Sequence, residues 1–455
     1  MSRLIKTVIL GAYAALIYQF IRTVFLTRHL ELIEIDYILD TRPSKLLQRE
    51  MVRRKQVASV MNLHFKKLDR LPTDYKYILK WTDAYAHYMT PLKRNHQNVF
   101  VDSNCSFVNC YLTTDRRLLS DVRHFDAILF DVENNWDFHP LIRSPYQKFV
   151  FVAMESAASY PLCYKGWDNY FNLTWTYKLD SDIRWSYITV LDKNGTVVGP
   201  KVDMNWVDPM DPAPESVMKV IKGKNKTAAW FVSHCKSKGK REDYVDRLQA
   251  ALRKYGLEVD IFGWCGKLQC TKDRLSDCLK IVEQEYFFYL AFENSLSEDY
   301  VTEKLLYAVH HHTVPIVYGG ANYSRFLPPG SYINAREHEP RIVASMMHKA
   351  INNPQVYEDY FRWHNYYTYK RSPEDTDVCN LCERLNEPLT FRAVKNLRKW
   401  WLEDYEKVCK VEVLKNNTEK PCDIDRTVFT VYSVTPHIVI EATKYEDVTT
   451  IHHRL

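Results

Sequence analysis

Short apolar runs separated by polar segments fill the second half of the chain, and their lengths predict alternating strands and helices. Residues 286–292 form an apolar, aromatic run of buried-strand length, and residues 294–299 after it are typical of a turn. Residues 300–310 carry apolar side chains at near-helical spacing, which predicts a helix. Residues 314–318 form a second short apolar run. The region therefore predicts a strand–loop–helix–strand unit.

Polar residues gather in this unit between the first strand and the helix. We expect Glu303 and Lys304 to lie one turn inside the helix. In an α/β sheet, ligands bind beyond the carboxyl ends of the strands, and helix N-termini there favour anions. A lysine in the first turn opposes the helix dipole, which makes sense if an anionic ligand offsets its charge. Taken alone, these two residues are better explained as a solvated Glu–Lys pair on an ordinary unit.

Similar patterns continue the alternation in both directions. The further expected strands are 98–102, 127–131, 148–153, 185–190, 228–233 and 257–262, and the further expected helices are 242–255 and 341–352. A proline-rich break at 208–214 reads as a linker. We therefore expect an α/β protein with two doubly wound domains, residues 76–207 and 215–375, that face a cleft.

The two ends of the chain differ from this body. Residues 8–26 are mostly apolar and span the ~20 residues that a membrane helix needs. We interpret them as an uncleaved signal anchor behind a cytoplasmic tail of residues 1–7, and a cleaved signal peptide is the competing interpretation. Residues 27–75 suit a stem, and residues 376–455 form a C-terminal extension whose role no pattern indicates.

Composition places the chain among folded, secreted or lumenal proteins. Among 455 residues, 46% are hydrophobic and 26% charged, and the net charge of +6 is too mild to indicate a nucleic-acid partner. It fits a basic cleft or an ordinary solvated surface. Six N-x-S/T sequons, which are glycosylation signals in the secretory lumen, begin at Asn104, Asn172, Asn194, Asn225, Asn322 and Asn416.

The chain contains 11 cysteines, which a lumenal compartment would allow to form disulfides. They include the close pairs Cys105/Cys110 and Cys265/Cys270 and the C-x-x-C motif at Cys379/Cys382. Half a zinc site is the alternative for this motif, but no second pair of ligands stands at a suitable spacing nearby. We therefore prefer disulfides, with at least one thiol left over because the count is odd.

One segment resembles a known family. The pattern FENSxxxDYVTEKLxxA…VPxVxGxxNYxxFxPxxSYI, present here from Phe292 to Ile333, resembles the donor-binding signature of the α1,3/4-fucosyltransferases, glycosyltransferase family ten. Asn322 lies within this signature, so its sequon is the one for which no modification is the alternative. The resemblance implies a GT-B fold, with two Rossmann-like domains and the donor held mainly by the second. It also implies an inverting Golgi enzyme that takes fucose from GDP-β-L-fucose. No metal cofactor is then required, and stimulation by Mn²⁺ stays open.

The resemblance also suggests which residues carry the chemistry. FVAMESAASYP is similar to the family's MESP-type motif, which makes Glu155 the proposed catalytic base, with Ala157 where the family has proline. VSHCKSKGKR is similar to VSNCxxxxxR, so Arg241 and Lys304 are the expected cations for the departing diphosphate. A flexible basic loop is the alternative for the first of these segments.

The remaining donor contacts follow from the same signature. We expect Glu303 to bind fucose or ribose hydroxyls, Asn294 and Ser295 to make further donor contacts, and Tyr300 to pack on guanine or ribose. Tyr289 is expected in the core. The Asp180-x-Asp182 pair lies in a stretch similar to NWTxSYRxDSDI and is interpreted as structural, the alternative being a Mn²⁺ site. Three consecutive histidines at 310–312 splay around a helix and cannot easily share a metal.

The acceptor is harder to predict. CSFVNCYLTTD, from Cys105 to Asp115, is similar to a stretch of the invertebrate and plant enzymes that fucosylate the innermost GlcNAc of N-glycans. N-acetyllactosamine acceptors of the Lewis type stay open, because acceptor loops vary most. Two further alternatives are a catalytically inactive glycan- or GDP-sugar-binding protein of the same fold and a transferase for another GDP-sugar. No pattern predicts the oligomeric state.

Overall fold

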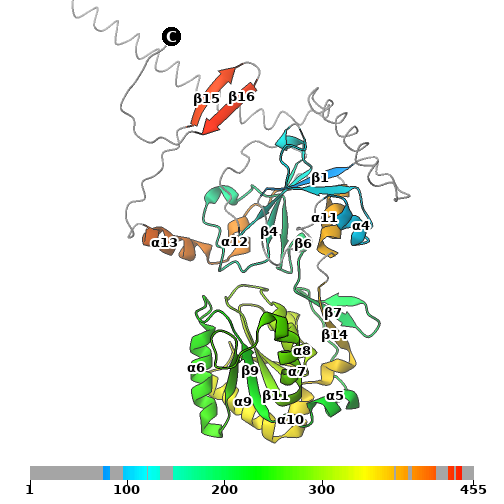
Figure 1. Cartoon of the computed structure of the whole chain (residues 1–455), viewed down its shortest axis with the longest axis vertical. Coiled ribbons are helices and arrows are strands. Elements are labelled where there is room, and N and C mark those ends of the chain that lie inside the picture. Colours follow the sequence, from blue (N-terminus) through cyan, green and yellow to red (C-terminus); the bar gives the residue numbers. More distant parts are fainter. Residues whose placement is uncertain are drawn as a thin grey trace, which may run out of the picture.

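The computed structural model describes residues 75–81, 96–119, 121–133, 147–372, 376–387, 392–416, 429–434 and 437–442. Within these ranges the body consists of two α/β halves, each built on its own parallel sheet (Figure 1). The α/β class predicted from the sequence is therefore confirmed. The predicted tail, the anchor at 8–26 and the stem lie outside the described residues, apart from Tyr75, and no described helix is long and apolar enough to cross a membrane.

The N-terminal half contains a six-stranded sheet in the order β2-β1-β3-β4-β5-β6, with all neighbours parallel. The strands are β1 (Lys76–Lys80), β2 (Cys110–Thr113), β3 (Ala127–Asp131), β4 (Lys148–Ala153), β5 (Leu173–Thr176) and β6 (Ile183–Arg184). β3 and β4 have the predicted bounds and are almost entirely buried, as strands covered on both faces are. Asp131 pairs with Val152, so the chain leaves both strands at the same edge of the sheet.

The prediction of a strand at 98–102 is wrong, because these residues form the helix α4 (Asn98–Asp102). Val99 and Phe100 are both fully buried, and two adjacent residues reach the same core more readily from a helix than from a strand. A five-residue apolar run cannot be assigned by its period alone. The predicted strand at 185–190 is displaced, since β7 spans Ile188–Asp192.

The C-terminal half contains a five-stranded parallel sheet in the order β10-β9-β11-β12-β13. Its strands are β9 (Lys226–Phe231), β10 (Val259–Phe262), β11 (Tyr286–Phe292), β12 (Val314–Tyr318) and β13 (Ile333–Asn334). Its helices are α5 (Glu215–Ile221), α6 (Arg241–Leu252), α7 (Leu275–Glu285), α8 (Glu303–His310), α9 (Pro340–Asn352) and α10 (Pro354–Asp359). β11 and β12 match the predicted strands residue for residue.

Alternate residues of the central strand β11 point to opposite faces of the sheet and pack into two different hydrophobic cores. Phe288 and Leu290 of β11 pack with α6 and α9 on one face of the sheet. Tyr289 and Ala291 of the same strand pack with α7 and α8 on the other face. Tyr289 is therefore a core residue, as predicted. The sheet is covered on both sides, and ligands can approach it only from an edge, beyond the ends of its strands.

The helix α8 begins later than predicted. Tyr300 to Thr302 are not helical, so Glu303 and Lys304 are the first two residues of the helix and do not lie one turn inside it. The helix α6 ends at Leu252 and continues as a 3₁₀ turn to Tyr255, where Gly256 adopts a φ of 70° and stops it as predicted.

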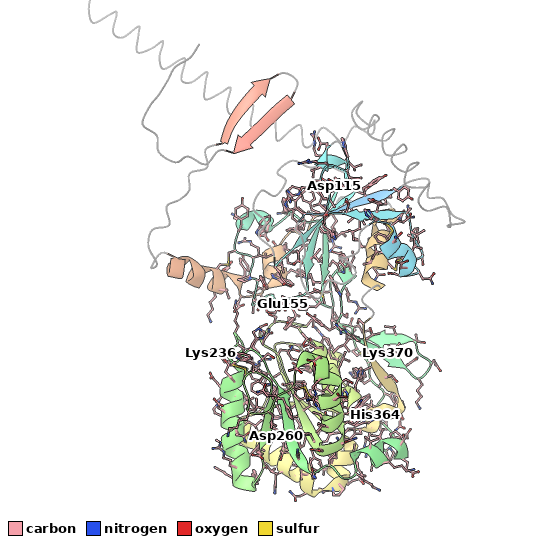
Figure 2. The ribbon with its side chains drawn as sticks, viewed as in Figure 1. Asp115, Glu155, Lys236, Asp260, His364 and Lys370 are labelled. Carbon is pink, nitrogen blue, oxygen red and sulfur yellow. A yellow bond between two sulfur atoms is a disulfide. The ribbon has the colours of Figure 1, made fainter. Side chains whose placement is uncertain are left out.

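Several segments join the two halves. A small antiparallel sheet pairs β7 from the first half with β14 (Tyr367–Arg371) from the end of the second, and β8 (Val197–Gly199) completes it. The Lys178 ammonium contacts Glu298 at 2.7 Å, and Lys238 donates to the carbonyl of Ala158 at 3.0 Å. Figure 2 shows Glu155 at this junction.

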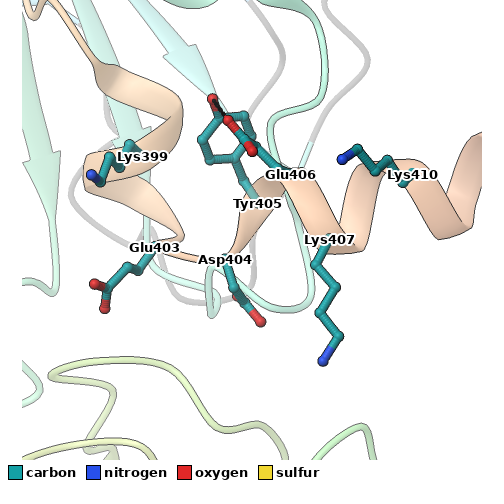
Figure 3. A pocket seen from close by; sticks show the side chains of 7 residues that line it. All are labelled: Lys399, Glu403, Asp404, Tyr405, Glu406, Lys407 and Lys410. Atoms are coloured by element: carbon teal, nitrogen blue, oxygen red, sulfur yellow. Dashed lines mark hydrogen bonds between the residues drawn. The ribbon is translucent and has the colours of Figure 1, made fainter.

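The segment after β14 returns to the N-terminal half. Trp401 of α12 (Leu397–Trp401) is buried and packs edge-on against Phe151 of β4, with ring centroids 5.0 Å apart. α13 (Tyr405–Asn416) follows, and a hollow of about 590 Å³ lies along these two helices (Figure 3). The strands β15 (Phe429–Val434) and β16 (His437–Ala442) form an antiparallel pair farther along the chain.

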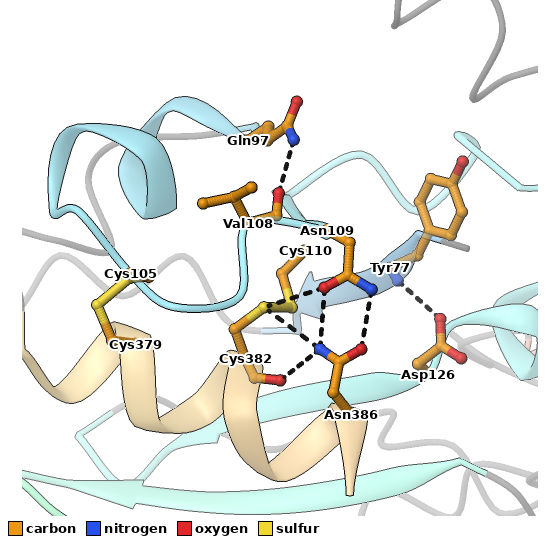
Figure 4. Close-up of a disulfide and its surroundings, with 10 residues drawn as sticks. All are labelled: Tyr77, Gln97, Cys105, Val108, Asn109, Cys110, Asp126, Cys379, Cys382 and Asn386. Carbon is orange, nitrogen blue, oxygen red and sulfur yellow. Dashed lines mark hydrogen bonds between the residues drawn. A yellow bond between two sulfur atoms is a disulfide. The ribbon is translucent and has the colours of Figure 1, made fainter. Parts of the chain in front are cut away.

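The helix α11 (Thr376–Asn386) is tied to the N-terminal half by two disulfides (Figure 4). Cys379 pairs with Cys105 and Cys382 with Cys110, so the C-x-x-C motif is not half a zinc site. The remaining disulfides join Cys163 to Cys409, Cys235 to Cys265 and Cys270 to Cys278. The expectation of disulfides is confirmed, and the eleventh cysteine, Cys422, lies outside the described residues.

Candidate active site

A cavity of about 620 Å³ opens between the two halves and is lined by residues from both. Its size falls in the range of ligand pockets. Six of the seven predicted site residues line it, namely Glu155, Arg241, Asn294, Tyr300, Glu303 and Lys304. The seventh, Ser295, does not. Residues that lie more than 100 positions apart in the sequence therefore meet in one cavity.

The topology explains why the C-terminal half contributes where it does. In the order β10-β9-β11-β12-β13, the chain turns to opposite sides after β9 and after β11, which opens a crevice at their carboxyl ends. Val232 to His234 follow β9 and line the cavity, and Asn294 follows β11 and does the same. The site lies at the position where open α/β sheets generally bind ligands.

The Lys304 ammonium lies in a closed network of oxygen atoms. It contacts Glu293 at 3.1 Å, Glu303 at 3.2 Å and the Thr302 hydroxyl at 2.7 Å. Burial alone would lower the pKa of Lys304, but the charges of Glu293 and Glu303 raise it. Lys304 in turn lowers the pKa of Glu303, against the effect of burial. Lys304 is thus a fixed positive charge whose ammonium is already oriented.

Glu293 is a site residue to which sequence reasoning assigned no role. Its side chain is 1% exposed, and one oxygen accepts from both the backbone N–H (2.8 Å) and the hydroxyl (3.0 Å) of Thr302, just before α8. Burial raises the pKa of Glu293, and Lys304 opposes that shift. The sequence signal for Glu293 is its place in the FENS tetrapeptide, which belongs to the segment that resembles the family's donor-binding signature. Its role is to hold Thr302 and Lys304 in position at the start of α8.

Arg241 is a buried cation that forms no ion pair with the described residues, although the charges of Glu293 and Glu242 oppose the effect of burial on its pKa. The side chain is 3% exposed, and its guanidinium donates to the carbonyls of Phe292 at 2.6 Å and His234 at 3.5 Å. Nε has no hydrogen-bond partner among the described residues, and burial lowers the pKa of Arg241. A buried charge is costly unless it is paired. Since Glu293 and Glu303 already balance Lys304, an anionic ligand in the cavity would supply the missing partner of Arg241.

Glu155 lies two residues beyond the end of β4 and faces the cavity from the N-terminal half. It accepts a hydrogen bond of 3.1 Å from the hydroxyl of Tyr300, which comes from the other half. The ring of Tyr300 is 2% exposed and packs edge-on against Tyr177, with centroids 5.0 Å apart. The expected stacking of Tyr300 on a base or ribose is therefore not favoured, and its hydroxyl orients Glu155 instead.

Ala157 replaces the proline of the related motif, and the structure gives a reason. Its backbone N–H donates to the hydroxyl of Tyr177 at 3.0 Å, a bond that proline could not make. The next N–H, of Ala158, donates to the Ser297 hydroxyl at 3.0 Å across the junction. The turn that carries Glu155 is therefore fixed by backbone hydrogen bonds.

Asn294 and Ser295 differ in their access to the cavity. Asn294 lines it, and its buried side-chain oxygen has no partner among the described residues. Ser295 is fully buried beside Gly239, whose N–H donates to the Asn294 carbonyl at 3.0 Å. A direct contact of Ser295 with a ligand is therefore not supported by its position, although the residue helps to pack the two loops together.

The other motifs examined for metals have structural partners. Asp182 accepts from the backbone N–H and the hydroxyl of Thr174 at 2.9 and 3.0 Å, and Asp180 accepts from the Trp400 indole at 2.8 Å. The histidines at 310–312 contact three different groups: the Tyr369 carbonyl, the Tyr307 carbonyl and the Glu283 carboxylate.

Comparisons with known proteins agree with this arrangement. The family model "Fucosyltransferase, N-terminal" matches residues 73–188, and "Glycosyltransferase family 10 (fucosyltransferase) C-term" matches residues 221–400. Alpha-(1,3)-fucosyltransferase C of Drosophila melanogaster is 37% identical over 339 residues, which cover 71% of this chain and 77% of that protein. An alpha-(1,3)-fucosyltransferase of Caenorhabditis elegans is 31% identical over 316 residues, 67% of this chain and 66% of that protein.

A solved alpha1,3-fucosyltransferase with GDP-fucose covers 71% of this chain and 94% of its own at 15% identity. Its TM-score of 0.44 is too low to add to the assignment. The sequence relatives and the cavity between two parallel sheets define the class: the protein is a glycosyltransferase. Within that class, the chain belongs to glycosyltransferase family 10, the fucosyltransferases.

Proposed function

We propose that the protein transfers L-fucose from GDP-β-L-fucose, with inversion, in α1,3 linkage to a GlcNAc residue of a glycan. The observation that carries this proposal is Arg241, a buried guanidinium that faces the cavity beside Lys304 without a carboxylate partner among the described residues. A diphosphate is an anion with the geometry that a guanidinium prefers. The name of the Drosophila relative, Alpha-(1,3)-fucosyltransferase C, supports fucose as the sugar and α1,3 as the linkage.

The two sides of the cavity suit the two parts of the reaction. Glu155 accepts the proton of the acceptor hydroxyl while that oxygen attacks C1 of fucose from the face opposite the diphosphate. The bond from C1 to the phosphate oxygen breaks, and the electron pair leaves with GDP. Arg241 and Lys304 stabilise the negative charge of the departing GDP, so no proton and no metal ion is needed there. Glu303 is placed at the first position of α8 to bind a donor hydroxyl.

For the acceptor we propose the innermost GlcNAc of the N-glycan core. The stretch from Cys105 to Asp115 supports this choice by its resemblance, as does 28% identity over 315 residues to the Glycoprotein 3-alpha-L-fucosyltransferase A of Drosophila melanogaster. Lewis-type transfer to N-acetyllactosamine is the second candidate. A 4-galactosyl-N-acetylglucosaminide 3-alpha-L-fucosyltransferase of Gorilla gorilla gorilla, 30% identical over 286 residues, favours it.

A transfer assay separates these possibilities. Labelled fucose from GDP-fucose is offered to a chitobiose-core glycopeptide and to N-acetyllactosamine, with and without EDTA. We expect label on the core glycopeptide at a rate that EDTA does not reduce. Label on N-acetyllactosamine alone would favour the second candidate, and label on neither would favour an inactive binding protein. Loss of turnover in EDTA with recovery in Mn²⁺ would show that a metal is required, and turnover with GDP-mannose would identify a different donor.

We further propose that the protein is a single-pass type II protein of the Golgi membrane with its catalytic body in the lumen. Five disulfides and the exposed sequon residues Asn104, Asn194 and Asn225 support a lumenal body. Asn172 is a poorer acceptor of a glycan, because its amide donates to the Arg392 carbonyl at 2.9 Å. Removal of N-glycans should change the gel mobility of the wild type, and less so of an Asn104→Gln/Asn194→Gln/Asn225→Gln variant.

A further inference from the structure

Glu133 is a second carboxylate on the acceptor side of the cavity, and no motif pointed to it. It lies two residues beyond the end of β3, as Glu155 lies two residues beyond the end of β4. These strands are parallel neighbours, and the backbone N–H of Val132 still donates to the Val152 carbonyl at 2.9 Å beyond β3. The two glutamates therefore leave the sheet at the same edge, and both line the cavity.

The surroundings of Glu133 do not explain its charge. Its backbone N–H donates to Asp131 at 2.8 Å, but its side-chain oxygen Oε1 is enclosed and has no partner among the described residues. It forms no ion pair with them. Burial, together with the charges of Asp131 and Glu155, raises the pKa of Glu133 to about 7. An enclosed carboxylate beside other acids lowers the stability of the folded state. The side chain of Glu133 lines the cavity in which we propose that the reaction takes place.

We propose that Glu133 positions the acceptor sugar: its carboxylate accepts a hydrogen bond from a hydroxyl or N–H group of the acceptor adjacent to the hydroxyl that Glu155 deprotonates. The inference rests on the proposed transfer reaction and deepens it, because it assigns a residue that selects and orients the acceptor. In the innermost GlcNAc the 4-oxygen already carries the next sugar, so the donor beside the 3-hydroxyl is the N–H of the 2-acetamido group. Arg241 and Lys304 lie on the donor side and are not available to Glu133 for this purpose.

The test compares Glu133→Gln with the wild type and with Glu215→Gln, the same change at an 85% exposed position of α5. Glu133→Gln replaces the charged acceptor with a neutral amide oxygen, which forms a weaker hydrogen bond, so we expect the acceptor KM to rise about fivefold to tenfold. The dissociation constant of GDP and the KM of GDP-fucose should change less than about twofold. Glu215→Gln should match the wild type in all three constants.

The stability of the variant separates positioning from a structural role. The folded state raises the pKa of Glu133 above its ordinary value, so the ionised group destabilises the fold at pH 8 and its removal should leave the Tm equal or higher. An unchanged acceptor KM would overturn the inference, and so would a fall in kcat alone. A lower Tm with parallel losses in GDP affinity and acceptor KM would assign a structural role instead.

A wild-type protein that transfers no fucose to either acceptor would contradict the proposed function itself, whereas an active wild type with a normal Glu133→Gln variant contradicts only this inference. If Glu133→Gln is recovered in low yield, Glu133→Asp provides the second variant. It keeps the charge on a shorter side chain, and we expect an acceptor KM between those of the wild type and Glu133→Gln. The inference is also supported if the acceptor KM of Glu133→Asp equals the wild-type value while that of Glu133→Gln is raised. The negative charge would then be sufficient to bind the acceptor.

Discussion

The two sides of the cavity differ in how many partners the protein supplies to the charged side chains. On the donor side, Lys304 lies within hydrogen-bonding distance of Glu293, Glu303 and Thr302, and every one of these contacts is made within the protein. On the acceptor side, Glu155 accepts one hydrogen bond from Tyr300, and Glu133 retains an enclosed oxygen without a described partner. The pKa of Asp131 beside it is raised to about 6, chiefly by burial.

The difference matches what each side has to do. A group that stabilises a departing diphosphate must keep its charge and its place throughout the reaction, and a closed network achieves this because it requires no reorganisation. A group that accepts a proton or binds an incoming sugar must instead have lone pairs that the protein does not already use. The network around Lys304 is thus rigid and fixed in charge. Arg241 on the same side, and the carboxylates on the acceptor side, keep atoms available for a ligand.

The largest expected effect is a loss of transfer activity without a loss of GDP affinity, on replacement of Glu155. Glu155→Gln removes the proposed base but keeps the shape of the side chain, so we expect transfer to fall by about 10²- to 10⁴-fold. GDP affinity, measured by titration calorimetry, should stay within about twofold of the wild type, because Glu155 is not on the donor side. Equal losses of turnover and GDP affinity would mean that Glu155 maintains the structure of the cavity.

The next effect tests whether the donor side is one network. Lys304→Ala leaves Glu293 buried without its counter-ion, which should lower the free energy of unfolding by about 3–5 kcal/mol and weaken GDP binding about tenfold. The double variant Lys304→Met/Glu293→Gln removes both charges and should recover most of the stability in urea unfolding, but not the GDP affinity. Recovery of both would remove Lys304 from the diphosphate site.

A smaller effect concerns the contact that crosses the cavity. Tyr300→Phe keeps the buried ring but deletes the hydroxyl that donates to Glu155, so kcat should fall about tenfold, in line with a bond to a charged group of about 1.5 kcal/mol. Tyr357→Phe is the matched control, since this buried tyrosine donates its hydroxyl to the Phe287 carbonyl at 2.7 Å and does not line the cavity. Steady-state kinetics with equal losses in both variants would argue against a specific role of Tyr300.

The smallest expected effect is a dependence on pH that only one side shows. Because the pKa of Glu133 is raised to about 7, this carboxyl becomes protonated as the pH falls from 8 to 5.5, next to Asp131 and Glu155. We expect the acceptor KM to rise about threefold to tenfold over this range. The pKa of Lys304 is raised by its acidic neighbours, so it stays charged and the KM of GDP-fucose should change less. Steady-state kinetics measure the KM of each substrate while the other is saturating. Equal changes of the two KM values with pH would contradict the difference between the two sides.

Sequence reasoning identified the donor unit well because its signal is local. The strands at 286–292 and 314–318 follow from continuous apolar runs, and both have the observed bounds. The helix start was wrong by three residues, since Tyr300 is apolar enough to extend the helical pattern although its ring packs against the other half. The strand predicted at 98–102 failed for a related reason, because a short apolar run does not reveal whether a helix or a strand buries it.

Contacts between distant segments lay beyond such reasoning. No spacing indicates that Cys379 and Cys382 pair with Cys105 and Cys110, more than 270 positions away. Glu133 has no motif around it, and its place in the cavity depends on the pairing of β3 with β4.

The amino-acid sequence by itself determined the α/β class, the donor unit and six of the residues that line the cavity, because these depend on local periodicity and on short motifs that resemble a known family. The tertiary structure alone decided which charges are satisfied and which are left available. It closes the network around Lys304, leaves Arg241 without an acidic partner among the described residues and brings Tyr300 to Glu155. The physical reason is that the free energy of a charged group depends on its burial and its neighbours in space, and the order of residues along the chain does not specify either.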